Sequence, residues 1–400
     1  MPAATAGATT RTLAGIACET DSIETVPLAQ EPSFAHWQQD IPVEYAGLSP
    51  DDLTARIRAA RRALGTRAII LGHHYQREDV IEFADYRGDS FKLSQWAAGH
   101  PESEYIVFCG VHFMAEAADI LSAPHQKVVL PNLAAGCSMS DMADPDDVYS
   151  AWAEMEELGI AQDTLPVTYM NSAAALKAFV GEHGGAVCTS SNARKVLEWA
   201  FAQKKRVLFF PDQHLGRNTG YAMGIPQEEM VLWGWARPYG SMGGQTLDAL
   251  ERSRVILWAG HCSVHQRFTP QQIADVRAKY PDAIVVVHPE CRLETVQAAD
   301  LNGSTEFIAK TVAGAPAGST IAVGTEINLV SRLAKENPDK RVFCLDPVVC
   351  PCSTMYRVHP AYLAWALESL VGGRVENQIV VPPEIARDAK LALDRMLAIT

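Results

Sequence analysis

The sequence predicts an α/β fold of three similar units, each a three-layer arrangement of helices around a parallel sheet. Three β-branched runs, at residues 68–71, 167–170 and 283–287, are each followed by a segment with apolar residues at helical spacing. Strands that alternate with helices are typical of parallel sheets, because each helix carries the chain back to the starting edge. The 400 residues suit three units of about 100 residues with additional segments.

A repeated polar pattern supports the three units. Each β-branched run ends in a polar elbow, and a hydroxyl cluster at a predicted helix start follows 17, 19 or 16 residues later. The elbows contain His73, Asn171 and His288, and the clusters contain Ser90, Ser190, Ser304 and Thr305. Since ligands bind beyond the carboxyl ends of parallel strands, we expect the units to surround a pseudo-threefold axis with the active site at the centre.

Cysteines add a third repeated feature. Of nine cysteines, Cys137, Cys262 and Cys350 each lie in a loop that closes one unit, and no CxxC pair exists. Three isolated thiolates suit an iron–sulfur cluster with one iron open to substrate better than they suit tetrahedral zinc. Cys352 follows Cys350 so closely that its role is left open. The others are predicted to be ordinary buried thiols: Cys18, Cys109, Cys188, Cys291 and Cys344.

The remaining segments are assigned around the three units. We expect an N-terminal extension, partly disordered, at 1–50, the first unit at 51–150, the second at 151–280 with an insertion at 217–254, and the third at 281–358. The helical tail, residues 359–400, is predicted to pack on the first unit. The Gly- and Trp-rich insertion is predicted to form a lid or an interface loop.

Composition excludes several classes of protein. A formal charge of −13 disfavours nucleic acid as the main partner, because phosphate backbones select clustered Lys and Arg. No apolar stretch approaches the roughly 20 residues that a membrane helix needs. The first residues show no secretory signal pattern, and an odd number of scattered cysteines argues against a disulfide framework. The sequence therefore predicts a cytoplasmic enzyme.

A series of short motifs resembles the quinolinate synthase family. The motifs stand in the family's order: LGHHYQ, GDS, FCGVHFMAE, AAGCSM, YMNS, CTSSNA, FFPDQHLG, HCSVH, HPEC, GST, VGTE and CPCSTM. The resemblance implies condensation of iminoaspartate with dihydroxyacetone phosphate to quinolinate, phosphate and water, in NAD biosynthesis. It also implies one 4Fe-4S cluster per chain, held by Cys137, Cys262 and Cys350, and an L-aspartate oxidase as a possible transient partner.

The resemblance also assigns roles to the repeated polar residues. It implies that His73, Tyr75, Tyr169, His288 and Glu290 are catalytic. Substrate binding is implied for His73, Ser90, Tyr169, Asn171, Ser190, His288, Glu290, Ser304 and Thr305. We leave open whether Asp212, His214 and His265 surround the cluster ligands, and Glu326 is predicted to anchor a loop. Two residues depart from the family pattern: Glu306 stands where a small residue is common, and Tyr356 where Asn is often found.

Two other functions stay open at this stage. An open-iron hydro-lyase acting on one hydroxy acid needs the same cluster but leaves the hydroxyl clusters without a phosphate to bind. An iron–sulfur redox sensor needs the thiols but not the elbows, and is expected to carry a DNA-reading module, which the acidic chain lacks. Release of phosphate from dihydroxyacetone phosphate discriminates the synthase from the hydro-lyase.

Overall fold

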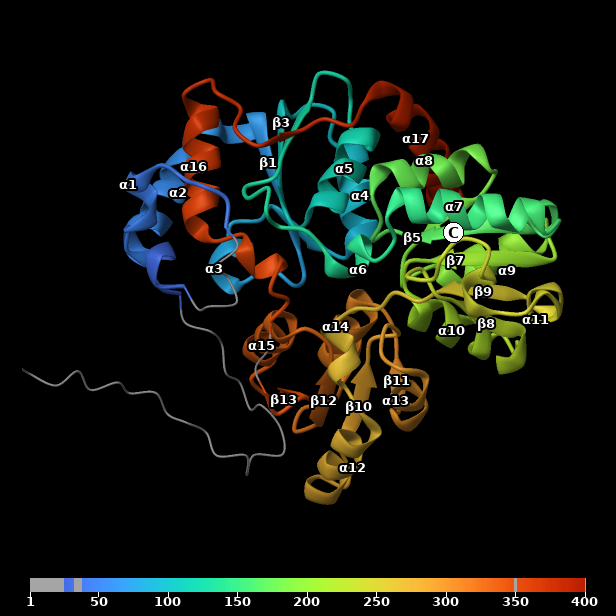
Figure 1. Ribbon diagram of the computed structural model, residues 1–400. Helices are drawn as coiled ribbons and strands as arrows, with labels where there is room; N and C mark the ends of the chain where they lie inside the picture. The colour runs from blue at the N-terminus through green and yellow to red at the C-terminus, as the bar shows by residue number, and fades with distance from the viewer. Residues whose placement is uncertain (1–24, 32–37, 349–350, 400) are drawn as a thin grey trace, which may run out of the picture.

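The computed structural model describes residues 25–31, 38–348 and 351–399, which form three sheets covered by helices (Figure 1). The first sheet contains β1 Ala68–His73, β2 Tyr86–Gly88, β3 Tyr105–Cys109, β4 Lys127–Val129 and β14 Gln378–Ile379. The second contains β5 Thr164–Tyr169, β6 Ala186–Cys188, β7 Arg206–Phe210, β8 Met230–Trp233 and β9 Val255–Trp258. The third contains β10 Ile284–Val287, β11 Leu301–Asn302, β12 Thr320–Gly324 and β13 Arg341–Cys344.

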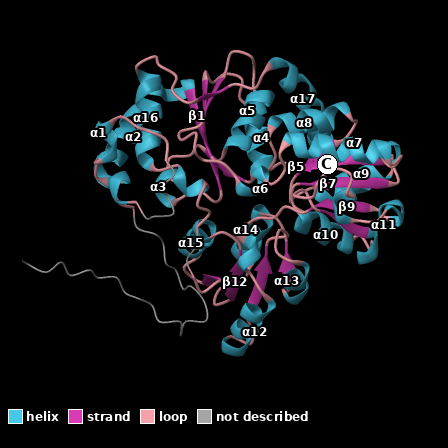
Figure 2. Cartoon of the chain, viewed as in Figure 1, coloured by secondary structure: helices cyan, strands magenta, loops and turns pink. Residues whose placement is uncertain are grey.

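Helices flank these sheets, and Figure 2 shows the strands of each unit between them. The helices that precede or follow the strands of the first unit along the chain are α1 Val43–Ala46, α2 Pro50–Leu64, α3 Glu78–Ile81, α4 Ser90–Gly99, α5 His112–Leu121 and α6 Ser138–Asp141. The middle of the chain adds α7 Pro145–Glu157, α8 Ala174–Glu182, α9 Ala193–Phe201, α10 Gln213–Ala222 and α11 Leu247–Arg252. The rest are α12 Pro270–Lys279, α13 Leu293–Ala298, α14 Thr305–Gly314, α15 Ile327–Glu336, α16 Pro360–Val371 and α17 Pro383–Ala398.

The three sheets repeat one strand order. The orders β2-β1-β3-β4, β6-β5-β7-β9 and β11-β10-β12-β13 are equivalent, and every pair within them is parallel. The first sheet adds β14, antiparallel to β4, and the second adds β8, parallel to β9. The predicted fold class, three α/β units with parallel sheets, is confirmed.

The second strand of each unit is short and was not predicted. β2, β6 and β11 have only three, three and two residues, too few to show an alternating pattern. Each ends beside the end of the unit's first strand, where Gly88 pairs with His73, Cys188 with Tyr169, and Asn302 with Val287. The hydroxyl residues Ser90, Ser190 and Ser304 follow two positions later. The short strands therefore fix where each hydroxyl cluster lies relative to its elbow.

A helix precedes the first strand of each unit, and this shifts two predicted boundaries. α7 packs against α8, and α12 packs against α13 and contributes Ile273 and Val276 to the apolar core of the third sheet. The boundaries predicted at residues 150 and 280 therefore fall too late. The first and second sheets share one continuous core, whereas the third has its own.

The described parts of the N-terminal extension pack on the first unit. Glu31 is buried and accepts a hydrogen bond from Arg77 at 2.8 Å, and Tyr45 donates to Glu368 of α16 at 2.6 Å. Residues 1–24 and 32–37 lie outside the described part of the chain.

The tail divides between two units. α16 packs against α2 and β14 pairs with β4, as predicted for a segment attached to the first unit. α17, however, packs mainly against α8 and β6 of the second unit, through buried residues that include Ala392, Leu393 and Met396. The prediction that the whole tail packs on the first unit is wrong for this last helix, because its apolar face covers the second sheet.

The insertion at residues 217–254 is part of the second unit. It contains the end of α10, the strand β8 and the helix α11, and β8 extends the sheet beside β9. The β-branched and aromatic run Met230–Trp233 explains why the segment forms a strand. No described residue of this segment lines the central cavity, and the lid or interface loop stays a prediction.

Gly181 in α8 marks the close approach of α17 to the second unit. A Cβ at this position would lie 1.9 Å from the carbonyl oxygen of Asp388, so Gly181→Ala must push the two helices apart. We expect the free energy of unfolding to fall by about 1 to 3 kcal/mol, measured by urea denaturation. Gly314→Ala in α14 is the matched control, because nothing lies within 4 Å of its added Cβ. Equal losses in both variants would contradict the proposed helix contact.

Candidate active site

One central cavity collects the repeated residues of all three units. Among the residues that line it are most of those predicted from the sequence: His73, Tyr75, Ser90, Cys137, Tyr169, Asn171, Ser190, Cys262, His288, Glu290 and Thr305. They lie at or beyond the carboxyl ends of parallel strands, where such sheets bind ligands. Two predicted residues are not among them. Ser304 instead caps α14 by accepting the Phe307 N–H at 3.3 Å, and Cys350 lies outside the described residues.

The hydroxyl clusters stand at helix starts, and the first two contact each other. Ser90 begins α4, whose cap Asp89 accepts the Lys92 N–H at 2.9 Å. The same carboxylate accepts a hydrogen bond from Ser191 Oγ at 2.7 Å, which joins the first unit to the second. Asp89 also lines the cavity and was not predicted to do so. Its carboxylate therefore places two helix starts side by side.

Two polar atoms on the cavity wall have no hydrogen-bond partner within the described structure. These atoms are Asn171 Oδ1 and Thr305 Oγ1, both buried. Buried polar groups are almost always paired, so an unpaired group facing a cavity indicates a polar ligand. Asn171 comes from the second elbow and Thr305 from the start of α14, and both were predicted to bind substrate.

The first elbow fixes the hydrogen-bonding role of a buried imidazole. The Tyr75 N–H donates to His73 Nδ1 at 3.2 Å, so Nδ1 is the acceptor and the proton of the neutral ring resides on Nε2. Burial, followed by the neighbouring His74 and Arg332, lowers the pKa of His73 well below its ordinary value. His73 is therefore neutral at pH 7 and offers an Nε2–H donor.

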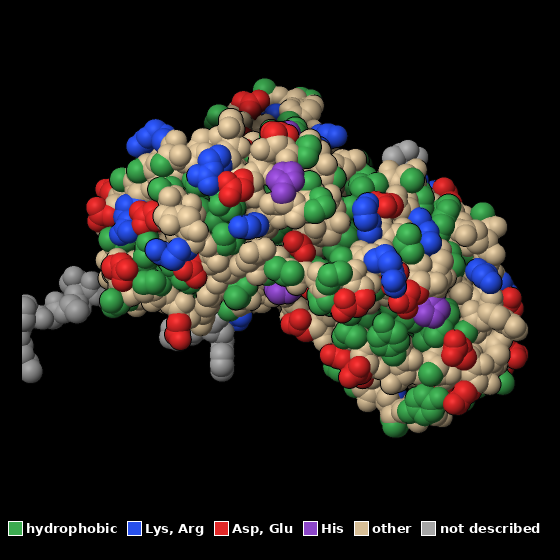
Figure 3. Space-filling model, turned by 90° about the horizontal axis from the view of Figure 1, so that it is seen from above, with side chains coloured by type: hydrophobic (Ala, Val, Ile, Leu, Met, Phe, Trp, Pro, Cys, Tyr) green, Lys and Arg blue, Asp and Glu red, His purple; other side chains and the backbone are tan. Residues whose placement is uncertain are grey.

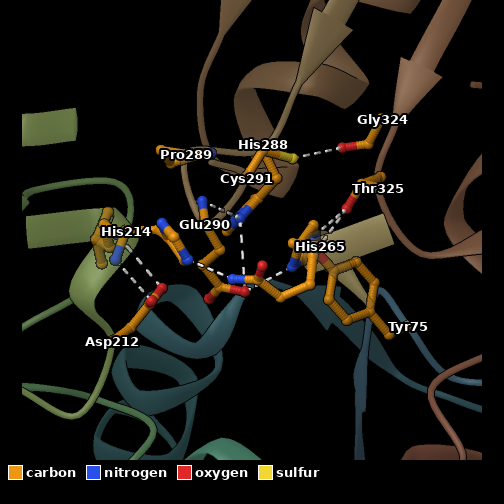
Figure 4. Close-up of polar contacts among 12 residues, drawn as sticks. Tyr75, Asp212, His214, His265, His288, Pro289, Glu290, Cys291, Gly324 and Thr325 are labelled. Carbon is orange, nitrogen blue, oxygen red and sulfur yellow. Dashed lines mark hydrogen bonds and ion pairs between the residues drawn. The ribbon is translucent and has the colours of Figure 1, made fainter. Parts of the chain in front are cut away.

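The third elbow holds a buried carboxylate against two imidazoles (Figure 4). His265 Nδ1 lies 2.7 Å from Glu290 Oε2, whereas His288 Nδ1 lies 3.8 Å from it and accepts the Glu290 N–H at 3.3 Å. Burial works to raise the pKa of Glu290, but His288, His265 and a hydrogen bond from Tyr169 outweigh it and hold that pKa well below its usual range. His288 itself is neutral at pH 7, since burial lowers its pKa to about 3. At neutral pH the support for the carboxylate therefore comes from His265 and Tyr169.

Two phenols on the cavity wall keep their protons. Burial, then the Glu290 charge, raises the pKa of Tyr75 and of Tyr169 well above the ordinary value. The Tyr75 hydroxyl lies 2.7 Å from Thr325 Oγ1, which is also 3.0 Å from His265 Nε2. Thr325 thus connects the first elbow to the imidazole beside Glu290. It was not predicted, because its place before Glu326 was its one distinguishing feature in the sequence.

One amide of the second unit fastens the third elbow. Asn218 Nδ2 in α10 donates to the carbonyl oxygens of Pro289 and Cys291, both at 2.7 Å. These two carbonyls flank Glu290. The contact was not predicted, because Asn218 is an unremarkable residue of a helix until the two units are placed together. At the start of the same helix, Asp212 caps α10 through the His214 N–H at 2.9 Å. Figure 4 shows Asp212 and His214 beside Glu290.

Three thiols from different units line the cavity. Cys137, Cys262 and Cys352 all face it, and burial raises the pKa of each, of Cys137 to about 12. Soft thiolate donors suit iron–sulfur clusters, and a bound metal deprotonates coordinating thiols, so this donor set fits such a group. Candidate ligand atoms of Cys262, His265 and Glu290 also lie within 4.8 Å of one another.

The remaining cysteines do not face the cavity. Cys109, Cys188, Cys291 and Cys344 are buried elsewhere, and Cys18 lies outside the described residues. The loop that carries Cys352 is held by Glu326, whose Oε1 accepts the Cys352 N–H at 3.2 Å. This hydrogen bond agrees with the prediction that Glu326 anchors a loop.

Comparison with known proteins assigns the family. Residues 55–398 match the family model described as quinolinate synthetase A protein. The chain belongs to this family. It is 59% identical over 368 residues to a quinolinate synthase of Corynebacterium glutamicum, covering 92% of this chain and 93% of that one. It is 54% identical to a quinolinate synthase of Streptomyces coelicolor, with 90% and 91% covered, and 53% identical to one of a Geobacillus species, with 90% and 97% covered.

Acidic and basic side chains are interspersed on the face shown in Figure 3, without a continuous basic stripe on that face. Within the described part of the chain, no helix is both long and apolar enough to span a membrane.

An ion-pair group centred on Glu306 joins the third unit to the first. Glu306 Oε2 in α14 accepts a hydrogen bond from Lys92 Nζ at 2.9 Å, and Glu306 Oε1 lies 2.9 Å from His74 Nε2. His74 is next to His73, and Glu306 is next to Thr305. The backbone oxygen of His74 also accepts a bond from the buried Arg332 at 2.7 Å. This group therefore sets the distance between two walls of the cavity.

We expect Glu306→Gln to lose about 1 to 2 kcal/mol of unfolding free energy at pH 7, since the carboxylate is mostly buried but Lys92 is partly exposed. The hydrogen bond with His74, opposed by burial and aided by Lys92, lowers the pKa of Glu306 from 4.5 to about 2. A depressed folded-state pKa gives stability that is present above pH 4.5 and is lost as the pH falls towards 2. The difference between wild type and variant should therefore shrink over that window, measured by urea denaturation at several pH values.

Glu102→Gln is the matched control, because Glu102 also lies 2.9 Å from a histidine, His100, but at an exposed site. Its effect should stay below about 0.5 kcal/mol. A pH-independent difference for Glu306→Gln would contradict the ion-pair assignment.

Proposed function

We propose that the protein is a quinolinate synthase that condenses iminoaspartate with dihydroxyacetone phosphate to quinolinate, phosphate and water, in NAD biosynthesis. One observation supports the proposal most strongly. Three hydroxyl-bearing helix starts, three thiols and the Glu290 group line the same cavity. Membership of the family and the names of its relatives point to the same reaction. The acidic chain is compatible with anionic substrates, because helix starts bind anions locally.

Substrate binding would use the unpaired atoms of the wall. Thr305 Oγ1 and the hydroxyls of Ser90 and Ser190, at or near the starts of helices, would donate to phosphate or carboxylate oxygens. Asn171 Oδ1 would accept from the imine nitrogen or a hydroxyl of the substrates. Groups from all three units would thereby hold the two reactants next to each other, which lowers the entropic cost of their condensation.

Proton transfers would fall to the elbows. The ionised Glu290 is suited to take a proton from carbon or nitrogen, and His265 and Tyr169 hold it in place. His73 Nε2–H and the neutral phenol of Tyr75 are suited to donate to oxygen as negative charge develops on an enolate or a leaving hydroxyl, whereas the Tyr169 hydroxyl donates to Glu290. His288 would keep the elbow's shape through its Nδ1 contact.

The cofactor would be one 4Fe-4S cluster held by three cysteines. Cys137 and Cys262 face the cavity, and the resemblance gives Cys350 as the third ligand, with Cys352 as the neighbour that could replace it. When bound, the cluster supplies an iron open to substrate, which acts as a Lewis acid in the final dehydration. We place the enzyme in the cytoplasm, supplied with its unstable imine by an L-aspartate oxidase.

Anaerobic purification with iron and sulfide analysis, followed by assays for quinolinate and phosphate, tests the proposal. Equal amounts of the two products from iminoaspartate and dihydroxyacetone phosphate are expected. An open-iron hydro-lyase would carry the cluster but release no phosphate, and absence of both cluster and product would overturn the proposal.

The ligand assignment predicts a graded set of cysteine variants. Cys137→Ala and Cys262→Ala should lose most bound iron and quinolinate formation, because two thiolates hold a cluster poorly. Cys188→Ala is the control, since Cys188 is buried away from the cavity and should leave the iron content unchanged. Iron per chain in Cys350→Ala and Cys352→Ala shows which of the two is the third ligand. Full iron content in Cys262→Ala would refute the assignment.

Glu290→Gln tests the proposed base. Loss of the carboxylate should lower kcat by about 10² to 10⁴ while the bound iron is retained, because general-base catalysis contributes that much. Steady-state kinetics and iron analysis of the same preparation measure both effects. Glu384→Gln, an exposed carboxylate on α17, is the control and should keep the wild-type kcat. A variant Glu290→Gln with unchanged kcat would exclude Glu290 as the base.

A further inference from the structure

A second cavity, of about 400 Å³, lies between the second and third units, outside the central one. It is formed by α10 and the segment after it on one side and by α13 on the other, and these two helices are in contact. Its polar wall consists of His214, Arg217, Gln227, Arg292, Glu294 and Gln297. None of these residues lines the central cavity. The catalytic roles proposed above leave this cavity unused.

The two arginines of this cavity lack acidic partners. Arg217 donates to the Met230 carbonyl at 3.3 Å, and Arg292 donates to Gln266 Oε1 at 2.6 Å. Within the described residues, neither guanidinium has a carboxylate at ion-pair distance, although Glu294 stands on the same wall. In a chain with 47 acidic and 34 basic residues, two neighbouring guanidiniums without a carboxylate partner mark a local positive field.

The positive field of this wall comes from the two arginines, because His214 is neutral at pH 7. Burial, and then His261, Arg217 and Arg292, lowers the pKa of His214 to about 4, so an additional proton on this wall is disfavoured. Burial also lowers the pKa of Arg217. A bound anion would offset this repulsion and accept hydrogen bonds from planar guanidiniums, which suit phosphate and carboxylate oxygens.

The arginines flank the contact that fastens the third elbow. Arg217 precedes Asn218, and Arg292 follows Cys291, whose carbonyl oxygen Asn218 binds at 2.7 Å. An anion held by both guanidiniums would therefore join α10 to α13 beside this contact. It would add a second tie between α10 of the second unit and the elbow that carries Glu290.

We propose that this cavity binds a small divalent oxyanion, a phosphate or a dicarboxylate, between Arg217 and Arg292, and that the bound anion stabilises the Glu290 elbow. The site is separate from the hydroxyl clusters of the central cavity. Either product of the proposed reaction has the required chemistry, so phosphate and quinolinate are tested as separate ligands.

The test measures binding of inorganic phosphate to the anaerobically purified holoenzyme by calorimetry and by the rise in Tm. All measurements are made in a Thr305→Val background, which weakens phosphate binding in the central cavity. We expect phosphate to raise Tm by about 2 to 4 °C and Arg217→Gln or Arg292→Gln to weaken its binding about tenfold. Arg62→Gln, an exposed arginine on α2, is the matched control and should bind phosphate like the background protein.

Quinolinate replaces phosphate in a second set of titrations, and the ligand with the larger Arg-dependent effect is the physiological one. Equal phosphate and quinolinate binding in the background protein and in an Arg217→Gln/Arg292→Gln double variant, or no binding in either, would overturn the proposal. The proposed function is judged separately, by quinolinate formation in the wild-type enzyme, so failure of one does not imply failure of the other.

Discussion

The buried carboxylate of Glu290 is the constraint on which the rest of the site depends. An ionised carboxyl removed from water is costly unless hydrogen bonds replace the lost hydration. Of its partners, Tyr169 ends the first strand of the second unit, whereas His265 lies between Val264 and Phe268 of the third core. The second and third units must therefore stay in register, and the Asn218 contacts to the carbonyls on either side of Glu290 keep them there. The position of one charge thus determines how two units pack.

Anion binding in an acidic protein rests on the geometry of helix starts. Net charge acts over long distances and is screened by salt, whereas backbone N–H groups and hydroxyls act within a hydrogen-bond length. The strand register places Ser90, Ser190 and Ser304 at equivalent points of three sheets. In the third unit, the Ser304 hydroxyl oxygen caps α14, whereas the Thr305 hydroxyl oxygen has no hydrogen-bond partner within the described structure. At this helix start, one residue therefore caps the helix and the next residue is left to bind a ligand.

Features that are local in sequence were predictable, and features that require two units to meet were not. The three units, their first strands and most cavity residues followed from the repeat, because each elbow and its hydroxyl cluster lie only 16 to 19 residues apart in the sequence. Asn218, Thr325 and Asp89 gained their roles only through partners at least 60 residues away. The packing of α17 on the second unit was missed for the same reason, since its apolar face fits either neighbour by pattern alone.

Polar ties close the three units into a ring. Ser191 to Asp89 joins the second unit to the first, Asn218 joins the second to the third elbow, and Glu306 joins the third unit to the first. Each tie lies beside a residue of the cavity wall. Because the third unit has an apolar core of its own, its position depends more on these ties than on shared burial. The geometry of hydrogen bonds and charges, rather than the hydrophobic core, therefore sets the distance across the cavity to Glu290 and Thr305.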